Sequence, residues 1–518
     1  MSVYLTPGVY VEEVNTGNEP IEGVSTSTVG FLGVAERGPS TATLLTSFTD
    51  FSRTFGSYYK TDRQFYLAYA VEGFFQNGGQ RCYVQTVTSS TAVPASQAID
   101  GKIDVAAVNG GAWGDNVAVK VEKSGNGTGI KITAMYWSTK PAVQADGKTV
   151  KVDPTSRAPA DLRSADRSLP QVSEVYDDLD ANPLSTSFYA SAINGVSKLI
   201  TVTQAAPGLP AVQALMLLSG GTDGAALTLA DFQGNPANPP GQKNGLDAFT
   251  AIDEIALLCC PDSYALGNND DINDSLIDQC EVLMSRFAII NSVANAPPPG
   301  TLSISYNSSY TGYYYPWINV IDPTTDQTVL IPPSGHVAGI YARTDDTRNV
   351  AKAPANAQIL GIDSLQFALT DGQQGSLNPI GINALRFFTG SGNLVWGART
   401  TSTDPQWRYI NVRRLFIFIE QSILRSTQWA VFEVNDQPVW DQITRSVSNF
   451  LTTLWTEDML QGATKEEAFF VRCDRTTMTQ DDIDNGRLIC MIGIAPVKPA
   501  EFVIFRIGQW VGGSSVTE

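Results

Sequence analysis

The sequence predicts a mixed α/β and α+β protein of several domains, built around an α/β core. The chain has 518 residues, enough for about three domains of ordinary size. Helical patterns and short apolar strands alternate over residues 26–90 and again over residues 240–400, whereas residues 91–239 hold short alternating strands separated by polar turns. The 44 glycines and 28 prolines indicate many turns rather than long helical bundles.

The first part of the core has a strand–helix–helix–strand pattern. TVGFLGVAERG, residues 28–38, predicts a strand before a Gly-Pro turn. In residues 47–56, Ser47 is a good N-cap for a short helix and Gly56 would end it. Apolar residues at three-and-four spacing then predict a helix over residues 62–76, and an Asn-Gly-Gly turn leads into a strand over residues 82–87.

Residues 91–239 predict a mostly β domain inserted into this core. Residues 116–124 and 129–137 alternate apolar and polar side chains, as half-buried strands do. A linker rich in Pro, Asn and Gly ends the insertion at residues 234–245. The core then resumes with a helix and a buried strand over residues 246–262, a strand over residues 286–292, and a helix of small residues within residues 332–356.

Residues 401–500 predict a C-terminal α+β domain. Two amphipathic helices begin near residue 407, and two strands follow at residues 468–474 and 488–496. The predicted apolar faces of the two helices are Val412, Leu415, Phe416, Ile419 and Ile423 on the first, and Val439, Ile443, Val447, Phe450, Leu454 and Trp455 on the second. The remaining parts are an N-terminal arm, residues 1–25, and a C-terminal arm strand within residues 501–518.

Composition excludes several classes of protein. The net charge of −18 argues against nucleic-acid binding, which selects basic surfaces. The six cysteines form no C-x-x-C pair, so we expect buried free thiols in a reducing compartment rather than disulfides. The chain shows no secretory signal pattern and no apolar run near the roughly twenty residues that span a bilayer. We therefore expect a protein made in the cytoplasm without membrane insertion.

Motifs that carry chemistry are incomplete throughout. The single histidine, His336, lies among small residues and favours a packing role over catalysis. AVQADGKT has Ala142 where a phosphate-binding loop needs its first glycine, and TGSGNLVWG has Val395 at the third glycine of a dinucleotide motif. In the calcium-like stretch that begins at Asp482, Gly486 and Gly493 stand where oxygen ligands are needed. We expect no enzyme activity, no catalytic residue, no cofactor and no metal.

Both chain ends have strand patterns without a local partner. Residues 8–14 alternate like a strand directly after Pro7, and residues 501–510 carry apolar side chains on both faces. A strand of the second kind needs cover on both faces and hydrogen bonds along both edges. The spacing leaves two alternatives open: each terminal strand completes a sheet of its own domain, or it adds to a sheet of another subunit.

Seven stretches in order carry a family resemblance. They are TPGVYVEEV near the start, residues 74–84, 220–224, 335–345, 352–356, 383–415 and 483–507. Together they resemble contractile tail sheath proteins of phages and related injection machines, most strongly in the C-terminal third. The insertion at residues 91–239 matches no shared motif, as expected if it is a variable outer domain.

The resemblance implies a structural subunit. Such subunits polymerise as stacked hexameric rings around an inner tube, and a baseplate signal triggers contraction that drives the tube through a target envelope without nucleotide hydrolysis. The implied partners are further copies of the chain, the inner tube protein, and the baseplate and terminator proteins. The implied place is a phage tail or injection particle assembled in the bacterial cytoplasm. A non-contractile shell or tubular assembly protein with the same strand exchange is the alternative.

The resemblance also implies roles for individual residues. Terminal arms exchanged between subunits would add strands to a sheet of the C-terminal domain. The arm residues would be Pro7, Gly8, Val9, Tyr10 and Val11 at one end, and Phe502, Val503, Ile504, Phe505 and Ile507 at the other. The helix predicted over residues 408–425 would contact the inner tube through Arg408, Arg413, Arg414 and Arg425. These arginines could equally pair with acidic side chains inside the subunit.

Overall fold

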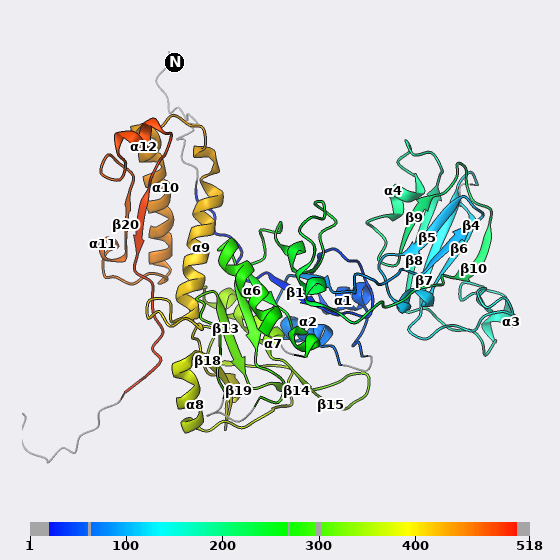
Figure 1. Ribbon diagram of the computed structural model, residues 1–518, viewed down its shortest axis with the longest axis horizontal. Coiled ribbons are helices and arrows are strands. Elements are labelled where there is room, and N and C mark those ends of the chain that lie inside the picture. The colour runs from blue at the N-terminus through cyan, green and yellow to red at the C-terminus, as the bar shows by residue number, and fades with distance from the viewer. Residues whose placement is uncertain (1–19, 61–63, 126, 268–269, 297–301, 505–518) are drawn as a thin grey trace, which may run out of the picture.

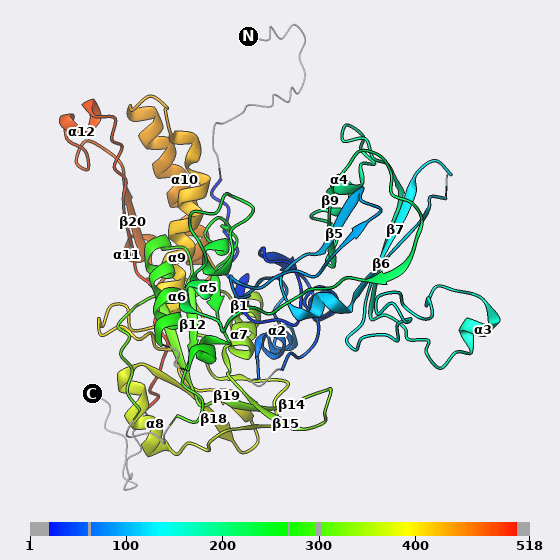
Figure 2. The ribbon, with the colours of Figure 1, turned by 45° about the vertical axis from the view of Figure 1, so that its right-hand side comes forward.

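A computed structural model describes residues 20–60, 64–125, 127–267, 270–296 and 302–504. Three parts lie side by side in Figure 1: a central α/β body, a mostly β part that contains strands β4 to β10, and a C-terminal part of two long helices and a narrow sheet. Turning the molecule by 45° in Figure 2 keeps the mostly β part clear of the C-terminal helices. The mixed α/β character predicted from the sequence is confirmed by this arrangement of several sheets.

A nine-stranded sheet forms the centre of the α/β body. Its order is β16-β19-β18-β13-β12-β11-β1-β3-β2, parallel from β18 to β3 and antiparallel at the two ends. In chain order the strands are β1 Val29–Gly33, β2 Thr43–Leu45, β3 Cys82–Thr86, β11 Leu257–Cys259, β12 Phe287–Asn291, β13 Thr311–Tyr315, β16 Ala357–Gln358, β18 Ile382–Phe388 and β19 Gly392–Val395. Residues of β1, β11, β12 and β13 are buried throughout, which parallel strands covered on both faces require. The strands predicted at residues 28–38, 82–87 and 286–292 are confirmed.

Helices cover both faces of this sheet, as layered α/β architecture requires. Phe31 of β1 points into a core that it shares with α2 Leu67–Gln76 and α7 Ser334–Thr347. Leu32 points to the opposite core, which contains α6 Asp270–Leu283. Ser47 caps α1 Phe48–Phe55 by accepting a hydrogen bond from the Asp50 amide, as predicted.

The small residues of α7 have a packing reason. A Cβ added at Gly335 would lie 2.3 Å from the carbonyl oxygen of Ala70 in α2, and one at Gly73 would lie 2.3 Å from the His336 ring. The two helices therefore touch backbone to backbone, a distance that only glycine allows. This contact explains the small-residue helix predicted within residues 332–356.

Two antiparallel sheets make up the inserted part. One has the order β4-β5-β9, with β4 Ser96–Ile99, β5 Ile103–Ala107 and β9 Ile200–Gln204. The other has the order β10-β6-β7-β8, with β6 Val117–Lys123, β7 Ile130–Tyr136, β8 Val172–Leu179 and β10 Gln213–Leu217. Their inner faces share a core that includes Val105, Val119 and Val202. The strands predicted at residues 116–124 and 129–137 are confirmed.

The C-terminal part contains α9 Ile410–Ser426, α10 Gln437–Thr456 and the two-stranded sheet of β20 Phe469–Arg472 and β21 Met491–Ile494. Leu415 and Ile419 of α9 meet Val447 of α10 in one core, so the predicted helix faces are confirmed there. The first helix begins two residues later than Arg408.

Two sequence predictions differ from the structure. The helix expected after residue 246 is the short 3₁₀ turn Gly245–Phe249, and a turn at residues 250–251 follows it before β11. The strand expected over residues 501–510 is not formed at residues 501–504, which have no regular structure in the single chain.

The smaller elements complete the description. The helices are α3 Pro159–Leu162, α4 Tyr189–Ile193, α5 Leu229–Gln233, α8 Asp371–Leu377, α11 Lys465–Ala468 and α12 Gln480–Asp484. The strands β14 Ile318–Ile321, β15 Thr328–Ile331 and β17 Ser364–Leu365 form a small sheet beside the central one.

Candidate assembly surfaces

The N-terminal segment lies along α9 and runs opposite to it. The amide of Glu22 donates to the Ser426 hydroxyl at 3.2 Å, and the amide of Val24 donates to the Ser422 hydroxyl at 3.1 Å. The two serine hydroxyls lie on one face of α9. They accept hydrogen bonds from backbone amides that would bind water if the extended segment were alone. Residues 22–24 are thus fixed near the C-terminal end of α9.

A buried ion pair holds the next part of the same segment. Arg414 binds Asp345 of α7 at 2.5 and 2.9 Å and donates to the carbonyl oxygen of Thr26 at 2.9 Å. The Thr26 hydroxyl donates to the same carboxylate at 2.7 Å. Burial lowers the pKa of Arg414, but the Asp345 charge outweighs that effect and raises it. The pair joins α9, α7 and the N-terminal segment.

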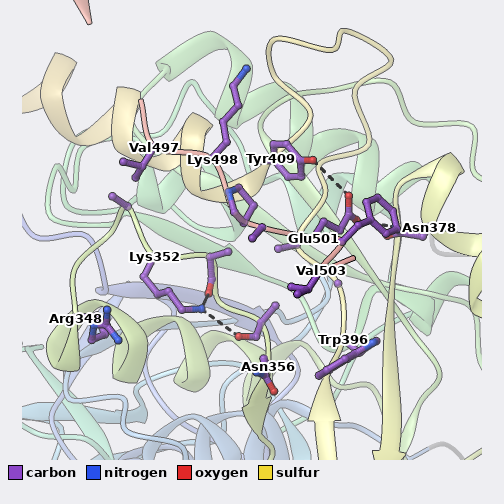
Figure 3. Close-up of a pocket in the computed structure, with 18 of the residues that line it drawn as sticks. Arg348, Lys352, Asn356, Asn378, Trp396, Tyr409, Val497, Lys498, Glu501 and Val503 are labelled. Atoms are coloured by element: carbon purple, nitrogen blue, oxygen red, sulfur yellow. Dashed lines mark hydrogen bonds between the residues drawn. The ribbon is translucent and has the colours of Figure 1, made fainter. Parts of the chain in front are cut away.

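Glu501 anchors the C-terminal segment. Its carboxylate accepts hydrogen bonds from Arg399 at 2.6 and 2.9 Å, from the Asn378 amide at 2.7 Å and from the Tyr409 hydroxyl at 3.3 Å. Figure 3 shows Asn378 and Tyr409 pointing toward this carboxylate at a groove of about 1150 Å³. Burial raises the pKa of Glu501, but the hydrogen bonds from Arg399 and Asn378 outweigh it and lower the pKa overall.

The chain becomes exposed directly after this anchor. Phe502, Val503 and Ile504 have 72%, 70% and 78% of their surface exposed. Three successive exposed large apolar side chains are typical of a segment that binds another protein, and they are unusual on the surface of a monomer. The exposed segment therefore begins at a fixed point of the domain.

The two segments meet opposite ends of one helix. Glu22 contacts Ser426, the last residue of α9, whereas Glu501 contacts Tyr409, which directly precedes its first residue. Segments about 480 positions apart in sequence are therefore held at the two ends of a single rigid element.

The sheet of β20 and β21 offers free strand edges. Within the described ranges, neither outer edge of this pair carries another strand, although Leu460 and Gln461 pair with Pro496 and Ala495 directly after β21. One face packs on α10, while the other exposes Phe470 and Met491, which have 48% and 53% of their surface in water. Two-stranded sheets are marginal alone, and unpaired edges accept further strands.

The four candidate arginines are divided by burial. Arg408 and Arg425 are exposed, and Arg425 donates to the Asp253 carbonyl oxygen at 2.6 Å. Arg413 is buried with its guanidinium 3.4 Å from the centre of the Trp407 ring, and it donates to the Ser309 hydroxyl at 3.0 Å. Arg414 is buried against Asp345. The alternative of an acidic partner inside the subunit therefore describes Arg414, while Arg413 is held by the Ser309 hydroxyl and the Trp407 ring, and neither forms one exposed row with Arg408 and Arg425.

The remaining candidate residues have simple placements. Pro7, Gly8, Val9, Tyr10, Val11, Phe505 and Ile507 lie outside the described residues. His336 is buried against Gly73, and burial lowers its pKa to about 4, so it is neutral at pH 7. Among the described residues, no cluster of His, Cys, Asp and Glu is arranged to hold a metal, and no helix has the length and apolarity to span a bilayer.

Two family models match the chain. The phage tail sheath protein central domain matches residues 240–401, and the phage tail sheath C-terminal domain matches residues 402–509, together more than half of the chain. The chain belongs to the tail sheath family. The matched region contains α9, the β20–β21 sheet and the Glu501 anchor, whereas residues 22–26 of the N-terminal segment lie outside it.

Individual sheath relatives are distant and are matched in part. The tail sheath protein of Vibrio phage KVP40 is 29% identical over 186 residues, which are 35% of this chain and 27% of that protein. The tail sheath protein of Burkholderia phage BcepMu is 26% identical over 299 residues, which are 54% of this chain and 61% of that protein. The matches thus span less than two thirds of either relative.

A solved structure shows the same fold over nearly the whole chain. The helical sheath of the anti-feeding prophage in its contracted state matches with a TM-score of 0.58 and 24% identity, covering 98% of this chain and 100% of that one. The mixed α/β architecture with several sheets is therefore a sheath fold.

Proposed function

We propose that this protein is the structural subunit of a contractile sheath. It polymerises as stacked hexameric rings around an inner tube, and the sheath contracts to drive the tube through a target envelope. The observation that carries the proposal is the apolar segment at Phe502, Val503 and Ile504, which starts at a fixed anchor and is largely exposed among the residues that the structure describes.

Strand exchange between subunits would bury this apolar segment against a neighbouring subunit. In the described part of the chain no further strand pairs with either outer edge of the β20–β21 sheet, and its exposed face carries Phe470 and Met491, so it suits an added strand. Burying Phe502, Val503 and Ile504 would contribute roughly 1.5–3 kcal/mol each, as an upper bound before association entropy. The N-terminal arm, with Pro7 to Val11, would add at the other edge.

The same proposal assigns the partners. They are further copies of this chain, an inner tube protein, and baseplate and terminator proteins, in a phage tail or injection particle assembled in the bacterial cytoplasm. No catalytic step and no cofactor are needed, since the work of contraction comes from exchanging one set of subunit contacts for another. Relatives of the chain are sheath proteins, which supports a structural rather than an enzymatic role.

Tube contact is proposed for the exposed arginines alone. Arg408 and Arg425 have charged side chains at the surface, whereas the guanidinium groups of Arg413 and Arg414 are occupied inside the subunit. Charge reversal by Arg408→Glu and Arg425→Glu should reduce co-sedimentation with purified tube protein. Arg157→Glu, an exposed arginine of the insertion, is the matched control. Unchanged co-sedimentation of the double variant would remove this assignment.

Electron microscopy of the purified full chain tests the main proposal. Long hollow tubes with helical ridges are expected, and deletion of residues 501–518 or 1–14 should abolish them while circular dichroism shows a folded monomer. Closed shells would favour the alternative assembly protein. Complete tubes after either deletion would contradict strand exchange.

A further inference from the structure

Two cysteines face each other at the loop end of the β20–β21 hairpin. The antiparallel register pairs Arg472 with Met491, so the next residues along, Cys473 and Cys490, stand directly opposite each other. Both side chains belong to a small apolar cluster with Trp440 and Met478. They are 17 positions apart in sequence and are brought together by the hairpin register.

Their positions suit a disulfide. Residues directly opposite each other in an antiparallel pair have Cα atoms roughly 4.5–5.5 Å apart, within the roughly 4.4–6.8 Å that disulfides span. The two thiols already interact through a hydrogen bond between their sulfur atoms. Formation of the disulfide therefore requires little movement of either strand.

The two thiols differ in reactivity. Cys473 is buried, while Cys490 is half-buried and can be reached from solvent. The hydrogen bond from Cys473 lowers the pKa of Cys490 and raises the pKa of Cys473. Because a dissolved oxidant reaches the more exposed thiol first, Cys490 is the attacking sulfur and the buried Cys473 the resolving one.

We propose that Cys473 and Cys490 form a reversible oxidation site that staples this hairpin. The oxidant is a small disulfide such as oxidised glutathione. The Cys490 thiolate attacks one of its sulfurs, forms a mixed disulfide and releases one glutathione thiolate, which takes up a proton. The Cys473 thiol then loses its proton and attacks the Cys490 sulfur, releasing the second glutathione. Two protein thiols are oxidised and one disulfide is reduced to two thiols.

The consequence concerns the sheet that receives the terminal arms, and this part rests on the proposed function. A bond between Cys473 and Cys490 closes the loop of residues 474–489 and fixes the register of β20 against β21. The thiols stay reduced in the cytoplasm where subunits are made and become oxidised once a particle meets an oxidising exterior. The staple would then preserve the acceptor edges after release.

Thiol mapping of the full-length protein tests the site directly. The protein is incubated with oxidised glutathione, remaining thiols are alkylated without denaturation and then after denaturation, and tryptic peptides are identified by mass spectrometry. We expect the peptides containing Cys473 and Cys490 to be cross-linked, and the fully buried Cys82 and Cys280 to remain thiols. Cys490→Ser should abolish the cross-link and Cys280→Ser should leave it. Equal alkylation of both thiols with and without the oxidant, or a Cys490–glutathione adduct that Cys473 never resolves, would overturn the proposal.

A second measurement uses the wild-type chain alone. Arg475 and Arg487 are exposed trypsin sites inside the closed loop. Oxidation should slow cleavage there by at least about fivefold, since cleavage follows the open population of the loop. Cleavage at the same rate in both forms would contradict the staple. Both measurements can be made whether or not the protein forms tubes. A negative result for the disulfide can therefore be distinguished from a negative result for the sheath proposal.

Discussion

Arg399 and Glu501 form a two-pronged ion pair, with Nη2–Oε2 and Nε–Oε1 distances of 2.6 and 2.9 Å. Arg399 follows the central sheet in sequence, and Glu501 is the last residue before the exposed Phe502. Two parallel hydrogen bonds fix orientation as well as distance. The direction in which the C-terminal segment leaves the domain is therefore set by this pair.

Removal of the anchor should release the segment without unfolding the protein. We expect Glu501→Ala to lower the free energy of unfolding by about 1–3 kcal/mol, because charged hydrogen bonds at a half-buried site are lost. Limited proteolysis should show faster cleavage near Phe502. Asp371→Ala is the matched control, because its partner Arg386 is similar but Asp371 is exposed, and such pairs contribute about 0–1 kcal/mol. Equal effects of the two variants would contradict the anchor.

The anchor should weaken in acid. The pKa of Glu501 is lowered in the folded protein, so its contribution is fully present above the ordinary glutamate pKa of about 4.3 and is lost as pH falls through the folded-state pKa. Hydrogen-exchange protection of residues 497–501, measured relative to an unstructured chain at the same pH, should therefore fall below about pH 4.3 in the wild type. In Glu501→Gln, protection should be low already at pH 7 and change less. A difference between the two proteins that stays constant down to acid pH would disprove the assignment.

The buried pair of Arg414 and Asp345 should be essential for stability. Arg414→Met leaves a buried carboxylate without its partner, and about 3–5 kcal/mol of stability should be lost. Arg425→Ala, on the same helix but exposed, should cost about 0.5–1.5 kcal/mol for its single hydrogen bond. Urea unfolding measures both. Similar midpoints would mean that the pair is not the main connection between α9 and α7.

The contact between α2 and α7 should exclude even one methyl group. In Gly335→Ala the new Cβ would meet the Ala70 backbone, which cannot move aside as a side chain could, so we expect at least about 1–3 kcal/mol of destabilisation. Gly375→Ala is the control, because that exposed position of α8 has no atom within 4 Å of the added Cβ and should gain about 0.5–1 kcal/mol. Thermal unfolding separates the two, and a neutral Gly335→Ala would contradict the close approach.

Charge on the exposed face of β20 and β21 should block assembly while sparing the monomer. Phe470→Glu and Met491→Glu replace side chains that are half in water, so the monomer should lose no more than about 1 kcal/mol. Tube formation in electron micrographs should be lost, since the added strand would meet a charge. Val175→Glu, on an exposed position of the insertion, should assemble normally. Normal tubes from the Phe470 and Met491 variants would exclude the strand edges beside these residues as the acceptor of the added strand.

Local signals predicted much of the fold. The Ser47 cap, the buried strands and the apolar faces of α9 and α10 depend on neighbours in sequence, and the structure confirms them. Residues 246–252 were harder, because a short apolar stretch after a linker suits either a helix or a 3₁₀ turn and its tertiary neighbours decide.

The contacts at the candidate assembly surfaces could not be predicted from the sequence, because their partners are far apart along the chain. The apolar pattern at Phe502 to Ile504 can be read from the sequence, and its exposure is a property of the folded single chain. The partners of Glu501 come from positions 378, 399 and 409, and the partner of Arg414 lies 69 residues away, so no local pattern signals either contact. Cys473 and Cys490 likewise become neighbours through the hairpin register alone.

Helix α9 separates the contact of Glu22 with Ser426 from the contact of Glu501 with Tyr409. With 17 residues it is about 25 Å long, and a helix packed on both α10 and the central body does not change length. In the proposed sheath, where the chain ends would join neighbouring subunits, α9 would hold the two joining points of each subunit at a constant distance. We therefore expect such a sheath to change pitch and diameter by rotation of its subunits at these points, with the fold of each subunit unchanged.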